Sequence, residues 1–194
     1  MAFTQRSEPT RTAILNSARR LLASKGYEGT TIRAVAADAG IDPSMVMRYY
    51  GSKEGLFAAA VDIDLQLPDP TGCPREQVGE VFARHVLARW EGELSDELIT
   101  LLLRSAGTNP TAAAQVRQVF QRQVVEMVRQ VAGDGPDVAT RAAMLSTQVL
   151  GVAMCRYVLE IPPVVALDGE RLVALLAPVL QHYLVGDIER PMAG

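Results

Sequence analysis

The 194-residue sequence predicts an all-α protein, and three observations lead to this prediction. Apolar residues recur at the three- and four-residue spacing of amphipathic helices, whereas the alternation typical of strands is nearly absent. Glycine and proline interrupt this pattern at intervals that suit separate helices. A hydrophobic content of 48% with 21% charged residues supplies enough apolar surface for a packed interior, so intrinsic disorder is not expected.

The first helix is expected over about residues 10–25. Ile14, Ala18, Leu21 and Leu22 fall at helical spacing and form one apolar stripe. Gly26 follows and suits the left-handed position that commonly ends a helix. The next residue, a tyrosine, is expected to pack against the end of this helix.

Two short helices follow, and a glycine turn separates them. Thr31 is a good N-cap for the first of them, which Gly40 stops. Asp42 and Pro43 restart the chain at once, because Asp caps a helix and proline at the first helical position sacrifices no hydrogen bond. Residues 31–50 therefore predict a helix-turn-helix motif.

A fourth helix, a linker and a helical body complete the prediction. Ser52 caps the fourth helix, which is expected to run from Lys53 to about Leu65. Residues 66–74 contain three prolines and one glycine and are the clearest linker. The remaining helices are expected at about 75–92, 95–106, 110–132, 136–158 and 168–185. A small trihelical head thus precedes a larger helical body.

The net charge of −3 is divided unequally along the chain. Residues 1–56 hold eight Arg and Lys against five Asp and Glu, which gives a net charge of +3. Residues 57–194 carry a net charge of −6. One end of the molecule can therefore meet a polyanion, whereas the other end is expected to stay away from it.

Other features limit the classes of function. Cys73 and Cys155 are too few for a disulfide framework and too isolated for a zinc site, which favours a reducing cytoplasm. The longest purely apolar run has nine residues and contains Pro178, so no membrane-spanning segment is expected. His85 and His182 lie outside any catalytic or metal-binding motif, so we expect no enzymatic activity, cofactor or metal.

The second helix of the predicted motif carries side chains suited to reading DNA. If Val46 and Tyr50 point inward, the opposite face is polar and basic. That face presents Ser44, Met45, Arg48 and, at its edge, Tyr49. They offer a hydroxyl, an apolar group for a thymine methyl, a guanidinium for guanine and a phenol for phosphate. Free N–H groups at the starts of neighbouring helices add sites for phosphate oxygens.

Short motifs occur in a fixed order over about fifty consecutive residues, 11–61. They are Gly26-Tyr27, Thr30-Thr31, Val35-Ala36, Ala39-Gly40-Ile41, Tyr49-Tyr50 and Ser52-Lys53-Glu54. In these motifs and their order the segment resembles the DNA-binding domain of the TetR family of transcriptional regulators. The resemblance implies a DNA-binding domain over residues 1–56 and a ligand-binding and dimerisation domain over residues 57–194.

The resemblance further implies a cytoplasmic homodimer whose two heads bind a palindromic operator in double-stranded DNA. A small, largely apolar effector that binds in the body would release the DNA, as in a repressor. The predicted fourth helix joins head and body, so an effector is expected to tilt it and change the spacing of the two recognition helices.

The resemblance also assigns roles to positions in the head. Thr31 and Lys53 match the family's phosphate contacts, and Arg33 matches a position that contacts bases or backbone. The recognition-helix positions are Pro43, Ser44, Met45, Met47, Arg48 and Tyr49. Family members usually have tyrosine at the position of Met47. Because methionine cannot donate a hydrogen bond, the contact there is lost or becomes apolar, which leaves the operator sequence open.

Two further surfaces are expected in the body. A mostly apolar pocket is expected among Phe82, His85, Trp90, Leu101, Arg104, Phe120, Met127, Met144 and Gln148, with core packing as the alternative for each. The last two helices combine small residues with more apolar surface than one buried stripe requires, which indicates a dimer interface. The expected interface residues are Ala143, Ser146, Gly151, Leu172, Leu176, Val179 and Tyr183.

Two alternatives remain open from the sequence. Met47 favours a helical small-molecule-binding or interaction protein whose head no longer recognises a specific site. A transcriptional activator of the same family fits the residues as well as a repressor does.

Overall fold

The computed structural model describes residues 8–91, 95–107 and 109–189, and within these ranges every regular element is helical. The all-α prediction is confirmed. The chain forms two compact units, which are called the head unit and the body unit below. The head unit comprises Met1–Ile63 and Glu97–Val116, and the body unit comprises Asp64–Asp96 and Arg117–Gly194.

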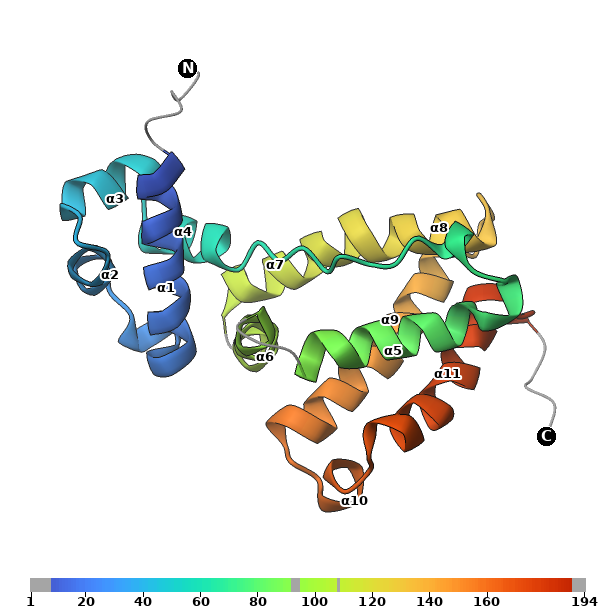
Figure 1. The fold of residues 1–194 in the computed structure, drawn as a ribbon. Helices are drawn as coiled ribbons and strands as arrows, with labels where there is room; N and C mark the ends of the chain where they lie inside the picture. Colours follow the sequence, from blue (N-terminus) through green and yellow to red (C-terminus); the bar gives the residue numbers. More distant parts are fainter. Residues whose placement is uncertain (1–7, 92–94, 108, 190–194) are drawn as a thin grey trace. The chain divides into compact units, whose positions relative to one another are not determined.

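The head unit begins with four helices (Figure 1). They are α1 (Glu8–Gly29), α2 (Ile32–Ala39), α3 (Pro43–Tyr50) and α4 (Lys53–Ala60). Ile14, Ala18 and Leu22 of the predicted stripe on α1 are buried, whereas Leu21 is only partly buried. α1 packs against both α2 and α4. Buried side chains from all four helices meet in this core: Ile14, Ala18, Leu22, Val35, Val46, Leu56 and Phe57. Burial of this common apolar surface holds the short helices together.

The predicted helix boundaries in the head follow from local chemistry. Thr31, Asp42 and Ser52 each accept a hydrogen bond from a backbone N–H two or three residues further on, at 3.1, 2.8 and 3.0 Å respectively. Each bond satisfies a donor that the helix itself leaves unpaired. Gly26 and Gly40 adopt φ angles of 68° and 66°, which glycine tolerates without strain, and the helical path breaks at both.

The fourth helix is shorter than predicted. α4 ends at Ala60 instead of near Leu65, and residues 62–69 follow an extended course (Figure 1). Asp64 Oδ1 accepts a hydrogen bond from the Gln66 N–H at 2.9 Å, and Gln66 has a φ of 49°. This local turn competes with continuation of the helix. The prediction of one continuous helix between head and body is therefore wrong.

Four helices enclose the core of the body unit. They are α5 (Val78–Glu91), α8 (Val125–Ala132), α9 (Val138–Ala153) and α11 (Gly169–Val185). α11 packs against α5, α9 and α8, and α5 against α11 is the most extensive of these contacts. Its core includes Phe82, Val128, Leu145, Leu180 and Leu184. A Cβ atom at Gly79 would lie 2.6 Å from Ala177 O and Gln181 N, so α5 and α11 approach this closely only with glycine there.

Shorter elements complete the described chain. They are the 3₁₀ turns η2 (Pro70–Gly72) and η3 (Arg75–Gln77), and the helices α6 (Ser95–Ala106), α7 (Pro110–Val119) and α10 (Pro162–Val165). Two π-helical segments, η4 (Phe120–Val124) and η5 (Met154–Val158), continue α7 into α8 and extend α9. The long predicted helices 110–132 and 136–158 are therefore present, each with a local π segment that changes the direction of its side chains.

α9 and η5 together, Val138–Val158, are long and apolar enough to cross a membrane by length and composition alone. The expectation that no segment is long and apolar enough to span a membrane is therefore wrong by length and composition. Small uncharged residues keep the mean hydropathy of this helix high, although it contains no long run of aliphatic residues. Such a helix is weak evidence of a span, since core helices pass the same test. Only 22% of the most apolar stretch of this helix is buried inside the protomer. α9 therefore has an exposed apolar side.

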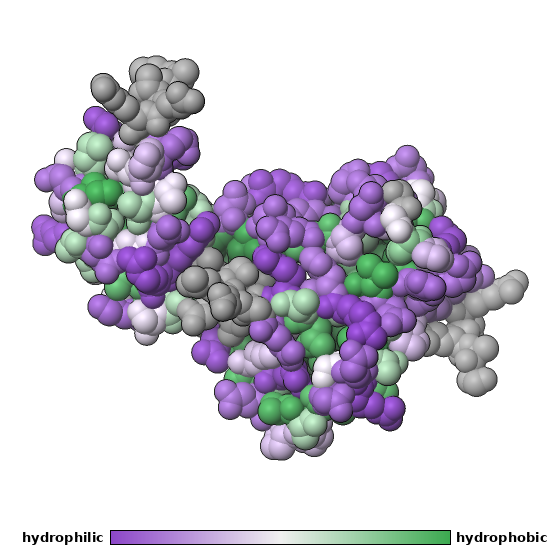
Figure 2. Space-filling model, in the orientation of Figure 1, coloured by the Kyte–Doolittle hydropathy of each residue, from purple (hydrophilic) through white to green (hydrophobic). Residues whose placement is uncertain are grey.

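Exposed apolar side chains also surround the turn at α10. Leu159, Ile161 and Val165 are exposed there. Figure 2 shows a mainly hydrophilic face with separate apolar patches, one of them at the lower edge near this turn. The exposed apolar surface of the body unit is therefore not confined to α9.

The head core gives a prediction for stability. Replacing fully buried Ile14 with alanine should lower the free energy of unfolding by about 2–5 kcal/mol, because it removes apolar contacts and leaves a cavity. Thr12→Ala, at an exposed position of the same helix, should change it by no more than about 0.5 kcal/mol. Urea unfolding followed by circular dichroism measures both. Equal effects of the two substitutions would contradict the assigned core.

Candidate nucleic-acid interface

α3 has one anchored side and one exposed side, as predicted. Val46 is fully buried, and Tyr50 is partly buried with its hydroxyl donating to the Arg11 carbonyl at 3.4 Å. Burial raises the pKa of Tyr50. On the other side Pro43, Ser44, Met47 and Arg48 are exposed, and Met45 and Tyr49 are partly exposed. The helix therefore presents the predicted recognition positions outward from a fixed base.

The start of α3 restricts what Ser44 can do. Asp42 Oδ1 accepts hydrogen bonds from both the backbone N–H and the hydroxyl of Ser44, at 2.8 and 2.5 Å. These bonds from Ser44 lower the pKa of the Asp42 carboxyl group. Because the hydroxyl hydrogen points to Asp42, Ser44 can meet a ligand only as an acceptor while this cap is intact.

Aromatic rings support the arginine of the recognition helix. The guanidinium carbon of Arg48 lies 5.5 Å from the centroid of the Tyr49 ring, within cation–π range. The Tyr49 ring in turn meets the Tyr50 ring edge-on at 6.3 Å. Since Tyr50 is anchored on α1, this series of contacts limits the directions that Arg48 can take.

The starts of α2 and α4 flank a hollow in the head unit. The hollow is shallow, and its lining includes Thr31, Lys53 and Tyr27 above apolar side chains of α1 and α4. The Thr31 hydroxyl oxygen accepts from the Ala34 N–H, so the cap does not use its hydrogen. Exposed Arg33 lies on the first turn of α2. Helix starts with a free hydroxyl hydrogen and an ammonium nearby suit phosphate oxygens.

A polar network that sequence reasoning missed joins α1 to α2. Ser17 is fully buried, and its hydroxyl lies 2.6 Å from Asp38 Oδ2 and 3.1 Å from the Val35 carbonyl oxygen. Arg20 contacts the same carboxylate at 2.5 Å. Hydrogen bonds from Ser17 and Arg20 lower the pKa of Asp38. A serine within the apolar stripe of the first helix was the available signal.

The predicted pocket residues are divided between the two units. Phe82 and Met127 are buried in the body core, and Trp90 and Phe120 pack against it. Gln148 is partly buried on α9, and Leu101 and Arg104 belong to α6 in the head unit. Met144 is 37% exposed, so its assignment to an interior pocket is wrong. The inward position of that turn is Leu145, one residue further on.

His85 contacts the extended segment that follows α4. Its Nε2 atom lies 3.0 Å from the Leu65 carbonyl oxygen, so that nitrogen carries the hydrogen. Arg89, one turn later on α5, donates to the Asp64 carbonyl at 3.0 Å, and Gln123 Oε1 accepts from the Leu65 N–H at 2.8 Å. These three side chains, called the linker clamp below, fix the extended segment on the body unit.

An apolar depression lies on the other side of α5. It leaves no room for a water molecule. Its lining is Ala83, Val86, Leu87, Trp90, Val152, Leu172, Val173 and Leu176, of which only Trp90 was predicted. Among the described residues no group of His, Cys, Asp and Glu side chains is arranged to hold a metal ion.

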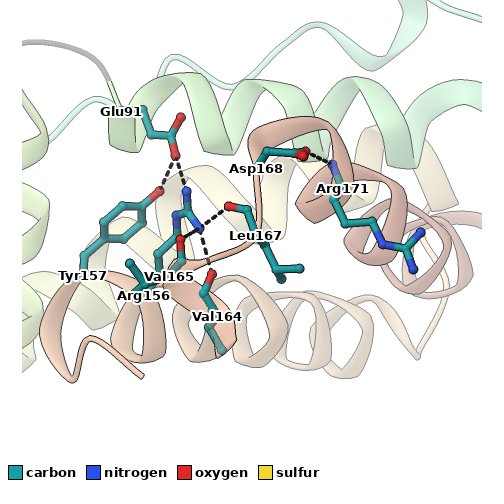
Figure 3. Close-up of polar contacts among 8 residues, drawn as sticks. All are labelled: Glu91, Arg156, Tyr157, Val164, Val165, Leu167, Asp168 and Arg171. Atoms are coloured by element: carbon teal, nitrogen blue, oxygen red, sulfur yellow. Dashed lines mark hydrogen bonds and ion pairs between the residues drawn. The ribbon is translucent and has the colours of Figure 1, made fainter. Parts of the chain in front are cut away.

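Arg156, on η5, links the end of α5 to the segment around α10 (Figure 3). Its Nη1 atom donates to the carbonyls of Val164 and Leu167 at 2.8 and 2.9 Å, and its Nη2 atom to Glu91 at 3.0 Å. Tyr157 also donates to Glu91, at 3.3 Å, and burial raises its pKa to about 12. An arginine in the apolar last two turns of the predicted helix 136–158 was the signal that sequence reasoning left unused.

The predicted dimer residues divide into two groups. Ala143 and Gly151 are exposed, and Ser146, Val179 and Tyr183 are partly exposed. Leu172 and Leu176 are only 5% and 8% exposed within the protomer, so their assignment to an interface is wrong. They pack inward, and the exposed side of α11 carries Ala174, Leu175 and Pro178 instead. Because α11 carries apolar residues on both its buried and its exposed side, the sequence did not show whether Leu175 or Leu176 points outward.

Comparison with known families agrees with the geometry of the head. The family described as "Bacterial regulatory proteins, tetR family" matches residues 14–60. The family described as "Tetracyclin repressor-like, C-terminal domain" matches residues 76–184, which is more than half of the chain.

Individual relatives cover different parts of the chain. The regulator UidR of Escherichia coli K12 is 33% identical over 55 residues, 28% of either chain. The regulator BetI of Rhizobium meliloti is 28% identical over 119 residues, which are 50% of this chain and 59% of that protein. The chain thus covers about a quarter of the length of UidR and about three fifths of the length of BetI.

Solved structures match over nearly the whole length. A TetR-family regulator from Streptomyces coelicolor is 26% identical, with a TM-score of 0.63 over 95% of this chain and 99% of that one. NalD of Pseudomonas aeruginosa has the same fold, at 21% identity and a TM-score of 0.68 over 93% and 99% of the two chains. From its two matched segments and its helix-turn-helix head, this chain belongs to the TetR family of bacterial DNA-binding transcriptional regulators.

Proposed function

We propose that the protein is a repressor that binds a palindromic operator as a homodimer and leaves it when a small, largely apolar effector binds. TetR-family members are non-enzymatic DNA-binding regulators, which supplies the class of activity. The observation that carries the proposal is α3, which presents Arg48 outward from a buried base at Val46. The protein would act in the cytoplasm, where its DNA lies.

The proposed DNA contacts divide by chemistry. Arg48 reads a base edge, because a guanidinium pairs in bidentate fashion with guanine. Thr31, Arg33 and Lys53 contact phosphates beside it. The neighbouring positions Pro43, Ser44, Met45, Met47 and Tyr49 complete the surface that faces the groove. The positive charge of residues 1–56 attracts the duplex, so these residues form the proposed DNA-binding domain although α4 continues to residue 60.

The proposed dimer forms through the exposed sides of α9 and α11. Ala143, Met144 and Gly151 on α9 and Leu175 on α11 supply small and apolar side chains to it. Two helices from each protomer would bury this surface in a four-helix bundle, as the family resemblance implies. A twofold dimer has to place its recognition helices about 34–36 Å apart to reach successive major grooves.

The proposed effector acts through α5, because that helix contacts both the apolar depression and the linker. One side of α5 lines the apolar depression with Val86 and Trp90, and another carries His85 and Arg89 of the linker clamp. An apolar molecule that opens the depression has to displace α5 or its neighbours, since no free volume exists there. Displacement of α5 alters the clamp and thereby the path of the linker. The effector shifts DNA binding only if it binds the altered state better.

Met47 favours the second candidate, a helical binding protein whose head recognises no specific site. Its side chain is 44% exposed on α3 and offers DNA no hydrogen bond. The two candidates differ in sequence specificity, whereas a repressor and an activator differ only in the response of the regulated promoter.

Arg48→Ala should relax specificity, whereas Lys53→Ala should weaken binding to every sequence. Loss of Arg48 should cost roughly 1–3 kcal/mol at one base position of each half-site. Loss of Lys53 should reduce the slope of log K against log salt by about 2 per dimer. Fluorescence anisotropy with an operator and a scrambled duplex measures both. A uniform loss for Arg48→Ala would make it a backbone contact, and an unchanged slope for Lys53→Ala would remove Lys53 from the phosphate contacts.

Leu175→Glu should separate the protomers, because it places a charge on the proposed apolar interface. The side chain is 48% exposed, so the protomer itself should stay folded. Sedimentation velocity should show monomers with a wild-type circular dichroism spectrum. Gln118→Glu, at an exposed position of α7 and outside both α9 and α11, is the control and should remain dimeric. A dimer that persists in Leu175→Glu would contradict this interface.

Gln123→Ala should weaken the response to the effector more than it weakens DNA binding without effector. The substitution removes one of the three clamp contacts and leaves the apolar depression unchanged. Gln121→Ala, on an exposed neighbouring position, is the control and should respond as the wild type does. Expression from a reporter promoter with and without inducer measures the response. An unaltered induction ratio in Gln123→Ala would exclude the clamp from effector coupling.

A further inference from the structure

Lys53 is held in one place before any DNA is present. Its ammonium nitrogen lies 4.3 Å from the centroid of the Tyr27 ring and 3.4 Å from the Glu28 carbonyl oxygen, to which it donates. The ammonium is therefore shared between an aromatic face and a backbone acceptor at the edge of the hollow that Thr31 also lines.

The Tyr27 ring is itself fixed by contacts that do not involve Lys53. Its edge meets the ring of Phe57, which is almost fully buried, with 4.9 Å between centroids and 80° between planes. Its hydroxyl donates to Glu54 Oε1 at 3.1 Å. The break of helical backbone at Gly26 turns the chain just before the ring. The lysine thus rests on a rigid platform.

We propose that Tyr27 is a positioning residue for DNA binding, through which Lys53 is directed at a phosphate. A lysine side chain has four rotatable bonds, and the ring restricts them in advance, so less freedom is lost when the phosphate arrives. The hydrogen bond from the Tyr27 hydroxyl to Glu54 helps to hold the ring, whereas the aromatic face is what meets the ammonium. This inference rests on the proposed role of Lys53 as a phosphate contact.

A double-mutant cycle on the full-length protein tests the proposal. The variants are Tyr27→Phe, Tyr27→Leu, Lys53→Ala and the double variant Tyr27→Leu/Lys53→Ala. The probe is a mixed-sequence DNA duplex, because phosphate contacts govern non-specific affinity. Tyr27→Phe keeps the aromatic face and should bind within about twofold of wild type, whereas Tyr27→Leu should bind about 2–5-fold more weakly per protomer. In the Lys53→Ala background, Tyr27→Leu should cause no further loss.

The outcomes separate the two proposals. Equal losses from Tyr27→Leu in both backgrounds would overturn the positioning role, because the effect would not pass through Lys53. Wild-type affinity in Lys53→Ala would overturn the phosphate contact itself, and the positioning role with it. Thermal melting checks that the leucine variant is folded. If it is not, Tyr27→Met, which keeps bulk against Phe57 without an aromatic face, takes its place in the same cycle.

Discussion

The body unit depends on the close packing of α5 against α11, which Gly79 makes possible. A side chain at this position would collide with the backbone of α11 at Ala177 and Gln181. The same glycine donates its N–H to Gln181 Oε1 at 2.7 Å, so a polar contact accompanies the close approach. With α5 fixed in this way, one side of it closes the apolar core and another holds the linker clamp. Any effector that separates α5 from α11 must act on both.

In the head unit, the positions of the short helices are determined mainly by residues at their own ends. Each of its three eight-residue helices begins with a side chain that caps it, and a buried aliphatic or aromatic residue ties each helix to α1 or its neighbours. Helices this short are not stable alone, so the shared core and the Ser17–Asp38 contact have to hold them. The side chains that we propose as DNA contacts therefore project from a fixed backbone, and aromatic rings limit the freedom of Arg48 and Lys53.

The sequence predicted the parts of the fold that local chemistry determines. The caps at Thr31, Asp42 and Ser52 and the buried side of α3 were all predicted correctly. The end of α4 was not predicted correctly, because it depends on an Asp64–Gln66 turn and on contacts of Leu65 with side chains 20 and 58 residues away in the chain. Such contacts leave no periodic signal.

Errors in the body have a common physical origin. At Met144 and Leu145, and again at Leu175 and Leu176, two adjacent apolar residues occupy one helical turn, and periodicity alone does not decide which of them points inward. Phe82 and Met127 of the predicted pocket lie in the body core, because apolar residues on core helices fill space unless something holds the helices apart. The DNA-contact assignments for the head stay predictions, although the structure exposes most of these positions.

The central claim, that the protein reads a specific palindrome as a dimer, is tested most directly by DNase I footprinting of the DNA upstream of its own gene. TetR-like pairing of two heads predicts two protected half-sites of inverted sequence, whose centres lie about one helical turn, or a multiple of it, apart. Protection should disappear when the effector is added. Uniform protection that follows no sequence, or protection of a single half-site, would contradict the account.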